Sequence, residues 1–194
     1  PHLHICLQSG SDAVLRRMCR RWSTQTFLQR CNLVRDTLDN PAITTDIITG
    51  FPGETDAEFD ESLATIRSAA FSKIHVFPFS ARRGTPAAEM DNQLPKSLKK
   101  QRGREIATLG EELQKAYYQS LVGKNLEVLV EAKDRDKPQH YVGTSCRYAP
   151  VEFPWTPELS DQTEQTGNNP IGQLIEVTAT ATADDRISAK VITS

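Results

Sequence analysis

The sequence predicts an α/β domain with a parallel sheet, followed by a small β-barrel. Three apolar or β-branched runs in residues 1–79 alternate with segments of helical periodicity, and short connections join them. That order is typical of right-handed βαβ units. After Gly123 the pattern changes to short β-rich runs separated by turns. Such runs favour an antiparallel barrel of about five strands, similar in size to an OB-fold.

The composition is that of a globular protein. The chain has 194 residues, of which 25% are charged and 38% are apolar, enough for one large or two small domains. No apolar stretch approaches the roughly 20 residues that span a bilayer, and no signal peptide opens the chain. We therefore expect a cytoplasmic protein without a membrane partner. Because Pro1 is not an initiator methionine, we also expect the chain to be a piece of something longer.

The first strand is predicted over His2–Gln8 and stops at a polar turn, where Ser11 or Asp12 can cap a short helix. That helix ends in RRMCRR, residues 16–21, which holds four arginines. Such a run is either a solvated helix end, favourable to the helix dipole, or a surface that meets phosphate. Both interpretations remain open from the residues alone.

The second helix is predicted to begin at Ser23 or Thr24 and to end before Asn40-Pro41. Its apolar face consists of Phe27, Cys31, Val34 and Leu38. We therefore expect Cys31 to be buried. The chain has four cysteines, Cys6, Cys19, Cys31 and Cys146. Their separations match no metal-binding pattern, so we expect neither a metal ligand nor a disulfide in this chain.

The central stretch TDIITGFPGET, Thr45–Thr55, joins a strand to a helix through a glycine-rich turn. The strand, Ile43–Thr49, is apolar and β-branched, as expected of a strand buried on both faces. Thr55 and Glu58 have the spacing of a capping box. An apolar stripe follows at helical spacing, formed by Phe59, Leu63, Ile66 and Ala70. On its own this turn is either an ordinary βα connection or a ligand site.

The third strand is predicted over Lys73–Phe79. In a parallel sheet the carboxyl ends of the strands meet at one edge, and ligands bind beyond that edge. Here those ends are residues 8–11, 50–54 and 80–85, and all three are polar and contain glycine. Their coincidence favours a ligand site at this edge.

A long charged helix is predicted from Pro95 to about Tyr118. Its buried stripe is expected to be Ile106, Leu109, Leu113 and either Ala116 or Tyr117. Its first turns hold Lys96, Lys99, Lys100, Arg102 and Arg104. These residues form either a solvated face or a phosphate-binding surface. The polar stretch Thr156–Pro170 is predicted to be a loop.

Charge is divided unevenly along the chain. Residues 1–118 hold 16 Lys and Arg against 14 Asp and Glu, a net charge of +2, whereas residues 119–194 hold 7 against 11, a net charge of −4. A barrel of this charge would have to bind RNA through a local patch rather than through its overall field. The residues available for such a patch are Lys124, Tyr141, Arg147 and Tyr148.

Three runs together resemble the radical S-adenosylmethionine methylthiotransferases. They are LHICLQSGSDAVLRRMCRRW (Leu3–Trp22), TDIITGFPGETDAEFDES (Thr45–Ser62) and IHVFPFSARRGTPAAEM (Ile74–Met90). Within that family the run His75–Ala88 is most similar to the enzyme that acts on N6-threonylcarbamoyladenosine next to the tRNA anticodon. The last domain is similar to the TRAM domain that closes such enzymes.

The resemblance implies two domains and assigns residues to a site. Residues 1–120 would be the C-terminal half of a (β/α)6 partial TIM-like barrel, and residues 121–194 a TRAM-like barrel. The cofactor-binding residues it implies are Gln8, Ser9, Ser11, Ile48, Gly50, Phe77, Pro78 and Phe79. The resemblance implies that Ser80, Arg82 and Thr85 face the target nucleotide or its phosphates. From their charge and position we add as candidate RNA-binding residues Arg83, Lys99, Lys100, Lys124 and Arg147. No catalytic side chain and no metal ligand is implied within this chain.

The family's reaction adds a methylthio group at C2 of an adenine, and the radical that this needs comes from the cofactor. The resemblance therefore implies S-adenosylmethionine and two [4Fe-4S] clusters, with the cluster cysteines upstream of Pro1. We expect the chain to be inactive alone and its partner to be a tRNA anticodon stem-loop. The residues do not indicate which molecule donates the sulfur. With about three of the family's six strands present, the first strand edge is expected to be exposed, and either to pair with another chain or to be covered in the parent protein.

Other functions remain open. A near alternative is modification of isopentenyladenosine in tRNA or of a ribosomal-protein aspartate, although Arg82-Arg83 favours a nucleic-acid target. A second class is a non-catalytic RNA-binding module. A third is a phosphate-binding enzyme that uses the helix start at Thr55 and needs a nearby general base. The four histidines lie in predicted strands or in the barrel, which gives that third class little support.

Overall fold

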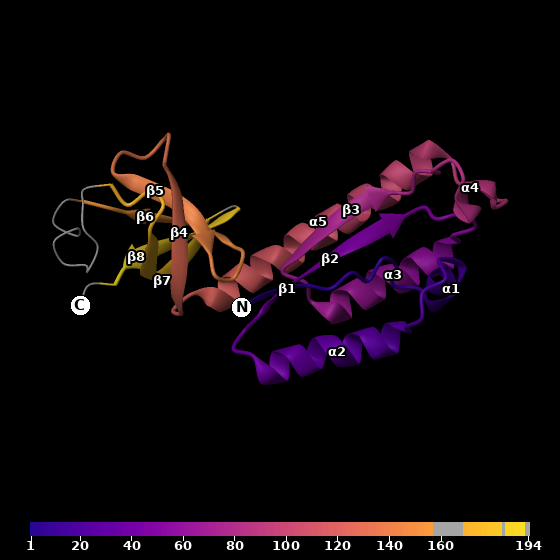
Figure 1. Ribbon diagram of the computed structural model, residues 1–194, viewed down its shortest axis with the longest axis horizontal. Coiled ribbons are helices and arrows are strands. Elements are labelled where there is room, and N and C mark those ends of the chain that lie inside the picture. Colours follow the sequence, from indigo (N-terminus) through magenta and orange to yellow (C-terminus); the bar gives the residue numbers. More distant parts are fainter. Residues whose placement is uncertain (157–168, 184, 193–194) are drawn as a thin grey trace. The chain divides into compact units, whose positions relative to one another are not determined.

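Figure 1 shows the computed structural model, which describes residues 1–156, 169–183 and 185–192. The chain forms two compact units, Leu3–Gln114 and Pro1–His2 with Lys115–Ser194. The elements of the first part of the chain are β1 (His2–His4), α1 (Asp12–Arg17), α2 (Thr24–Thr37), β2 (Ala42–Thr49), α3 (Asp56–Ala69), β3 (Lys73–Pro78), α4 (Pro86–Glu89) and α5 (Lys96–Leu121). The later elements are β4 (Asn125–Lys133), β5 (His140–Ser145), β6 (Pro150–Pro154), β7 (Leu174–Ala183) and β8 (Arg186–Val191).

The first unit is built on a three-stranded sheet in the order β1-β2-β3. β2 and β3 run parallel, from the pair Thr44 and Lys73 to the pair Thr49 and Pro78. Gln8, beyond the end of β1, adds a parallel bridge to Ile47. The predicted parallel sheet is therefore confirmed, although β1 ends at His4 and the rest of its predicted length is extended chain.

Helices α2 and α3 lie along the sheet (Figure 1) and share its core. The buried side chains of that core include Leu7, Phe27, Cys31, Ile43, Ile47, Phe59, Ile66, Phe71, Ile106 and Leu109. Cys31 is fully buried, as its place on the apolar face of α2 predicted. Within the described ranges, no helix combines the length and apolar character needed to cross a bilayer.

Local capping signals set the starts of two helices. At α3, the Thr55 hydroxyl accepts from the Glu58 N–H at 3.2 Å, and the Glu58 carboxylate accepts from the Thr55 N–H at 2.8 Å. At α2, the Ser23 hydroxyl accepts from the Thr26 N–H at 3.2 Å. Ser11 caps α1 through its backbone, without a side-chain hydrogen bond to the helix.

Helix α5 ends at Leu121, three residues beyond its expected end near Tyr118. Near this end Tyr118 is buried, Tyr117 is partly buried and Ala116 is exposed. The reason is that the two ends of α5 pack in different hydrophobic cores. Ile106 and Leu109 pack in the core of the sheet, whereas Tyr118 and Leu121 pack in the core of the barrel.

The barrel is closed in the order β4-β5-β6-β8-β7. Four of its neighbouring pairs are antiparallel and one, β6 with β8, is parallel. Alternate residues of β4 point inward, so Leu126, Val128 and Val130 are buried while Glu127 is exposed. The remaining core side chains include Val151, Phe153, Trp155, Ile175, Val177, Ile187 and Val191. Most of the predicted loop Thr156–Pro170, residues 157–168, lies outside the described residues.

Candidate functional site

The extended segment after β1 and the carboxyl ends of β2 and β3 meet at one edge of the sheet. The Gln8 carbonyl accepts from the Ile48 N–H at 2.8 Å, and the Phe79 N–H donates to the Thr49 carbonyl at 2.8 Å. Gln8 itself has a left-handed backbone, with φ of 69°, which turns the chain at this edge. The structure therefore brings together three of the predicted site residues, Gln8, Ile48 and Phe79.

A cleft of about 320 Å³ lies beside this edge. It is formed by the end of α1, the end of β2 and the segment that contains α4. Its lining consists of Arg17, Met18, Cys19, Arg20, Ile48, Phe51, Thr85, Pro86, Ala87 and Met90. Clefts of this size hold small molecules, and a mostly apolar wall with a few polar groups is their usual composition. The cleft can therefore hold a flat apolar group and orient it through its arginines.

Arg17 is fixed in the wall of the cleft by Glu58. Its two terminal nitrogens donate to the Glu58 carboxylate at 2.8 and 2.7 Å, and one also reaches the Gly53 carbonyl at 3.3 Å. The bond from Arg17 holds the pKa of Glu58 at about 2, well below its usual range. Among the described residues, the buried Nε of Arg17 has no hydrogen-bond partner. Arg17 therefore keeps one unused hydrogen-bond donor in the wall of the cleft.

Lys99, from α5, covers the ends of β2 and β3. Its Nζ donates to the Phe79 carbonyl at 3.3 Å and lies 4.9 Å from the centre of the Phe79 ring. The Thr49 hydroxyl donates to the Lys99 carbonyl at 3.2 Å. A Cβ added to Gly50 would lie 2.4 Å from the Lys99 Cγ. Three predicted residues, Gly50, Phe79 and Lys99, are therefore in contact, and Lys99 packs on strand ends rather than standing in solvent.

The turn between β2 and α3 is anchored by a buried charge. The Arg102 guanidinium donates to the Glu54 carboxylate at 2.7 Å and to the Asp56 carboxylate at 2.6 Å. The Gly50 N–H donates to the same Glu54 carboxylate at 3.1 Å. Burial raises the pKa of Glu54, and Arg102 opposes that rise. Arg102 was predicted to lie on a solvated or phosphate-binding face, and its 2% exposure makes that prediction wrong.

Ser9 and Ser11 are buried against α3. The Ser9 hydroxyl lies 3.3 Å from the Ser62 hydroxyl, and the Ser11 hydroxyl donates to the Glu61 carboxylate at 2.6 Å. A Cβ on Gly10 would lie 2.6 Å from the Ser62 Cα, so only glycine permits this close packing. The loop after β1 is therefore held by α3, with both serine hydroxyls engaged inside the protein.

The loop after β3 is open to solvent. Ser80, Arg82, Arg83 and Thr85 are all exposed, and so are Phe77 and Pro78 at the end of the strand. Thr85 closes a turn by donating its N–H and its hydroxyl to the Arg82 carbonyl, at 3.1 and 2.7 Å. Of these residues, Thr85 is the one that lines the cleft. The loop thus carries two exposed arginines, Arg82 and Arg83, next to a threonine that lines the cleft.

The other predicted RNA contacts belong to different segments of the chain. Lys100 is exposed on α5, and Lys124 is half-buried at the start of the barrel. Arg147 is 9% exposed, and burial lowers its pKa.

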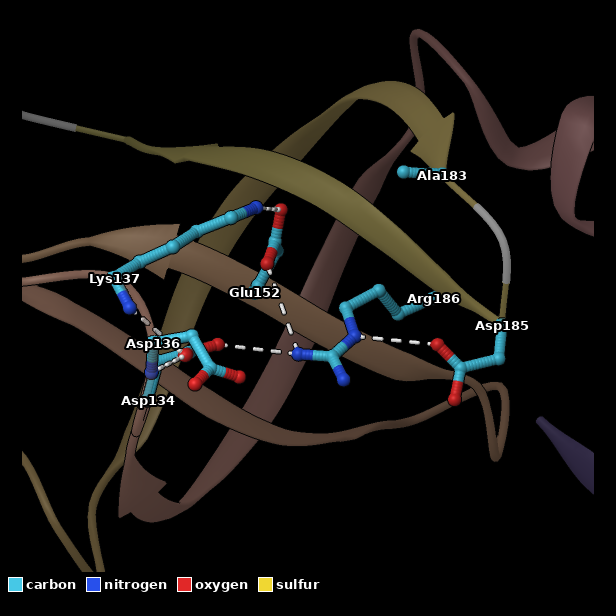
Figure 2. A pocket seen from close by; sticks show the side chains of 7 residues that line it. All are labelled: Asp134, Asp136, Lys137, Glu152, Ala183, Asp185 and Arg186. Carbon is cyan, nitrogen blue, oxygen red and sulfur yellow. Dashed lines mark hydrogen bonds and ion pairs between the residues drawn. The ribbon is translucent and has the colours of Figure 1, made fainter.

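The barrel carries a second, polar pocket of about 210 Å³, shown in Figure 2. Arg186 pairs there with Asp134 at 3.1 Å and with Asp185 at 3.3 Å, while Lys137 pairs with the buried Glu152. Because these ion pairs connect the Asp134–Lys137 turn to strands β6 and β8, we interpret the pocket as a polar contact that holds these three segments together.

Several residues of the cleft were not predicted as site residues. Met18, Phe51 and Met90 give it its apolar wall, and Arg17 and Arg20 its charge. The arginine run at residues 16–21 was the available signal, because it follows the first strand end. The short helix α4 (Pro86–Glu89), which brings Met90 to the cleft, had no periodic signal in four residues.

Comparison with known proteins identifies the family. The family model "Radical SAM superfamily" matches residues 1–66. The chain is 39% identical over 160 residues to the threonylcarbamoyladenosine tRNA methylthiotransferase MtaB of Bacillus subtilis, covering 81% of this chain and 36% of that protein. It is 43% identical over 131 residues to MtaB of Thermotoga maritima, covering 68% and 30%.

A second group of relatives has a different named product. The chain is 37% identical over 176 residues to the tRNA-2-methylthio-N(6)-dimethylallyladenosine synthase of Desulfitobacterium hafniense, covering 91% of this chain and 37% of that protein. The chain thus spans about a third of the length of the curated relatives it matches. Over the part that it spans, the chain belongs to the radical SAM tRNA methylthiotransferases.

Proposed function

We propose that this chain supplies the S-adenosylmethionine cleft and part of the tRNA-facing surface of a methylthiotransferase. The proposed reaction places a methylthio group on C2 of N6-threonylcarbamoyladenosine next to the anticodon. The observation that carries the proposal is the apolar, arginine-bearing cleft at the strand-end edge, in a chain homologous to enzymes named for this chemistry.

The cleft suits S-adenosylmethionine, which joins a flat purine to a charged amino acid. Ile48, Phe51 and Met90 offer apolar surface for a purine ring. The buried Nε of Arg17 is a hydrogen-bond donor for a ribose or carboxylate oxygen. The neighbouring strand ends are covered by contacts among Gly50, Phe79 and Lys99. These residues would therefore contact the cofactor through backbone atoms and van der Waals packing rather than through polar side-chain groups.

When bound with a reduced iron–sulfur cluster, S-adenosylmethionine supplies the radical that activates an otherwise inert C–H bond. The cysteines of this chain do not have the spacing of a cluster motif. We therefore propose that both [4Fe-4S] clusters are held by residues outside this chain and that the chain alone is inactive. The sulfur donor is left unassigned.

The tRNA anticodon stem-loop is proposed to meet the exposed loop after β3. Arg82 and Arg83 present planar guanidinium groups suited to phosphate, and Lys100 adds a further exposed charge. We propose the division at 120/121 as the start of a TRAM-like domain, with Lys124 as its contact to RNA. The outer edge of β1, which ends the order of its sheet, is the proposed surface for pairing with another chain.

The first test is genetic and chemical. Deleting the gene in its source strain should abolish 2-methylthio-N6-threonylcarbamoyladenosine in total tRNA, with the unthiolated nucleoside accumulating, as measured by mass spectrometry of nucleosides. Loss of the 2-methylthio derivative of isopentenyladenosine instead would assign the alternative substrate. No change in either nucleoside would exclude both functions.

A variant refines that test. Restoring the gene with Arg82→Ala and Arg83→Ala should return much less modified nucleoside than restoring it with Arg104→Ala, which removes an exposed arginine of α5. Equal recovery would remove the loop after β3 from the proposed RNA surface.

A further inference from the structure

We propose that His4, Cys6 and Asp46 form a zinc-binding site on the sheet of the first unit. The Cys6 Sγ lies 3.2 Å from the His4 Nε2 and 3.8 Å from an Asp46 carboxylate oxygen, and that oxygen lies 3.5 Å from the same Nε2. Among the described residues, these three form a group whose possible ligand atoms all lie within 4.8 Å of one another. The inference is independent of the proposed function.

Strand geometry brings the three side chains together. His4 and Cys6 are two positions apart in extended chain, so their side chains leave the same face. The Ile5 N–H donates to the Thr44 carbonyl, and the Gln8 N–H donates to the Asp46 carbonyl, both at 2.9 Å. This register places Asp46 of β2 beside the first strand. The alternate residues Ile5 and Leu7 point the other way, toward the core.

The site is accessible to an ion. The side chains of His4 and Asp46 are 39% and 30% exposed, and Cys6 is exposed. The three side chains are therefore open to an ion from solvent, while the sheet still holds them close together.

The separations match those of a metal centre. A tetrahedral zinc ion holds neighbouring nitrogen, oxygen and sulfur ligands about 3.3–3.6 Å apart, given its usual bond lengths. The observed separations of 3.2, 3.5 and 3.8 Å bracket that range. Shifts of a few tenths of an ångström in exposed side chains would bring all three atoms onto one ion.

The orientation of the His4 imidazole excludes a catalytic cysteine–histidine–aspartate system. In a cysteine–histidine–aspartate nucleophile system, the thiol and the carboxylate use opposite ring nitrogens. Here both face Nε2, while Nδ1 lies 2.9 Å from the Thr44 hydroxyl. An outer hydrogen bond of this kind on the second ring nitrogen orients a metal-binding histidine. The three groups thus converge on one point instead of forming a relay.

The donor set selects the class of ion. One imidazole, one thiolate and one carboxylate suit zinc, whereas magnesium and calcium prefer oxygen ligands alone. Binding would release the thiol proton to solvent. Three protein ligands leave a fourth position for water or a small anion, as in zinc sites that are not purely structural.

Cobalt(II) provides the spectroscopic test on the intact 194-residue chain. Titration should give one equivalent of bound ion, a thiolate-to-cobalt charge-transfer band and visible bands of tetrahedral intensity, all removed by zinc. Cys6→Ser should abolish the charge-transfer band, and Cys146→Ser, which removes another exposed thiol, should keep it. His4→Gln and Asp46→Asn should each weaken zinc binding by more than the roughly 10–100-fold loss that an outer-shell change produces.

A second measurement needs no variant. One equivalent of zinc should slow alkylation of Cys6 selectively, as identified by peptide mass spectrometry, and leave Cys19 and Cys146 unprotected. The proposal is overturned if the charge-transfer band is absent, if it survives Cys6→Ser, or if zinc protects the exposed thiols equally.

Discussion

The Arg102 guanidinium lies 2.7 Å from the Glu54 carboxylate, and both side chains are 3% exposed. Arg102 comes from α5, whereas Glu54 lies in the turn between β2 and α3, 48 positions earlier in the chain. The same guanidinium donates to the Glu54 carbonyl at 3.0 Å and lies 5.1 Å from the centre of the Phe59 ring. This pair therefore holds the glycine-rich turn that borders the cleft.

Breaking the pair from one side should destabilise the first unit strongly. Arg102→Met leaves the Glu54 carboxylate buried without its cation, and such changes cost about 3–5 kcal/mol. Urea unfolding followed by Trp22 fluorescence in a Trp155→Phe background reports on this unit. Arg104→Met is the exposed control on the same helix and should cost far less. Equal losses for the two variants would mean that the pair contributes nothing specific.

Gly50→Ala should destabilise the same turn for two separable reasons. Gly50 has φ of 71°, and its added Cβ would lie 2.4 Å from the Lys99 Cγ. The backbone conformation alone costs roughly 1–2 kcal/mol for an L-residue. Lys99→Ala removes the nearest atom, so the loss caused by Gly50→Ala should be smaller in that background. A double-mutant cycle by urea unfolding measures the difference, and strict additivity would contradict the contact.

The parts of the fold that the sequence predicted are those that depend on residues close together in the chain. The Thr55 and Glu58 capping box is decided within four positions, and both of its hydrogen bonds are present. The buried face of α2 follows from periodicity in the same way. The ends of β2 and β3 could be located for the same reason, since each is marked by its own turn residues.

The remainder depends on contacts between distant segments. In the sequence, Arg102 cannot be distinguished from the other charged residues of its helix. Its burial is explained only by its bonds to Glu54 and Asp56, which lie far away in the chain. Met90 reaches the cleft through a four-residue helix with no periodic signal. His4, Cys6 and Asp46 converge through the register of two strands, which no local spacing encodes.

Lowering the pH should remove the stabilisation that the Arg17–Glu58 ion pair gives the fold, and it should do so over a defined pH range. The pKa of Glu58 falls from 4.5 to about 2 in the folded state, chiefly through the bond from Arg17. A carboxylate whose pKa is lower in the folded state stabilises the fold at pH values above its pKa in the unfolded state. That stabilisation is lost as the pH falls through the pKa of the folded state. Stabilisation is therefore complete above about pH 5 and is lost between about pH 4.5 and pH 2.

Glu58→Gln removes this titration. Above pH 5 the variant should be less stable than the original chain by about 1–3 kcal/mol, discounted for the partial exposure of Arg17. The difference in free energy of unfolding should shrink toward zero near pH 2. Asp60→Asn, an exposed change on the same helix, should show no such convergence. A difference for Glu58→Gln that stays constant with pH would refute the ion-pair explanation.

Gly143→Ala should destabilise the barrel through sterics alone. A Cβ at this position in β5 would lie 2.1 Å from the Leu129 carbonyl oxygen of β4. That oxygen belongs to the backbone of a paired strand, so relief requires the β4–β5 ladder to shift. Overpacking of this kind costs about 1–3 kcal/mol or more. Thermal unfolding followed by Trp155 fluorescence in a Trp22→Phe background measures the loss.

Gly123→Ala separates this steric cost from a conformational one. Gly123 has φ of 85°, and among the described residues nothing lies within 4 Å of its added Cβ. The stability lost by Gly123→Ala should therefore come from the backbone conformation alone, roughly 1–2 kcal/mol. Gly143→Ala should lose more, although its φ is not positive. If the two variants lost equal stability, the close approach of β4 to β5 would not be what requires glycine at position 143.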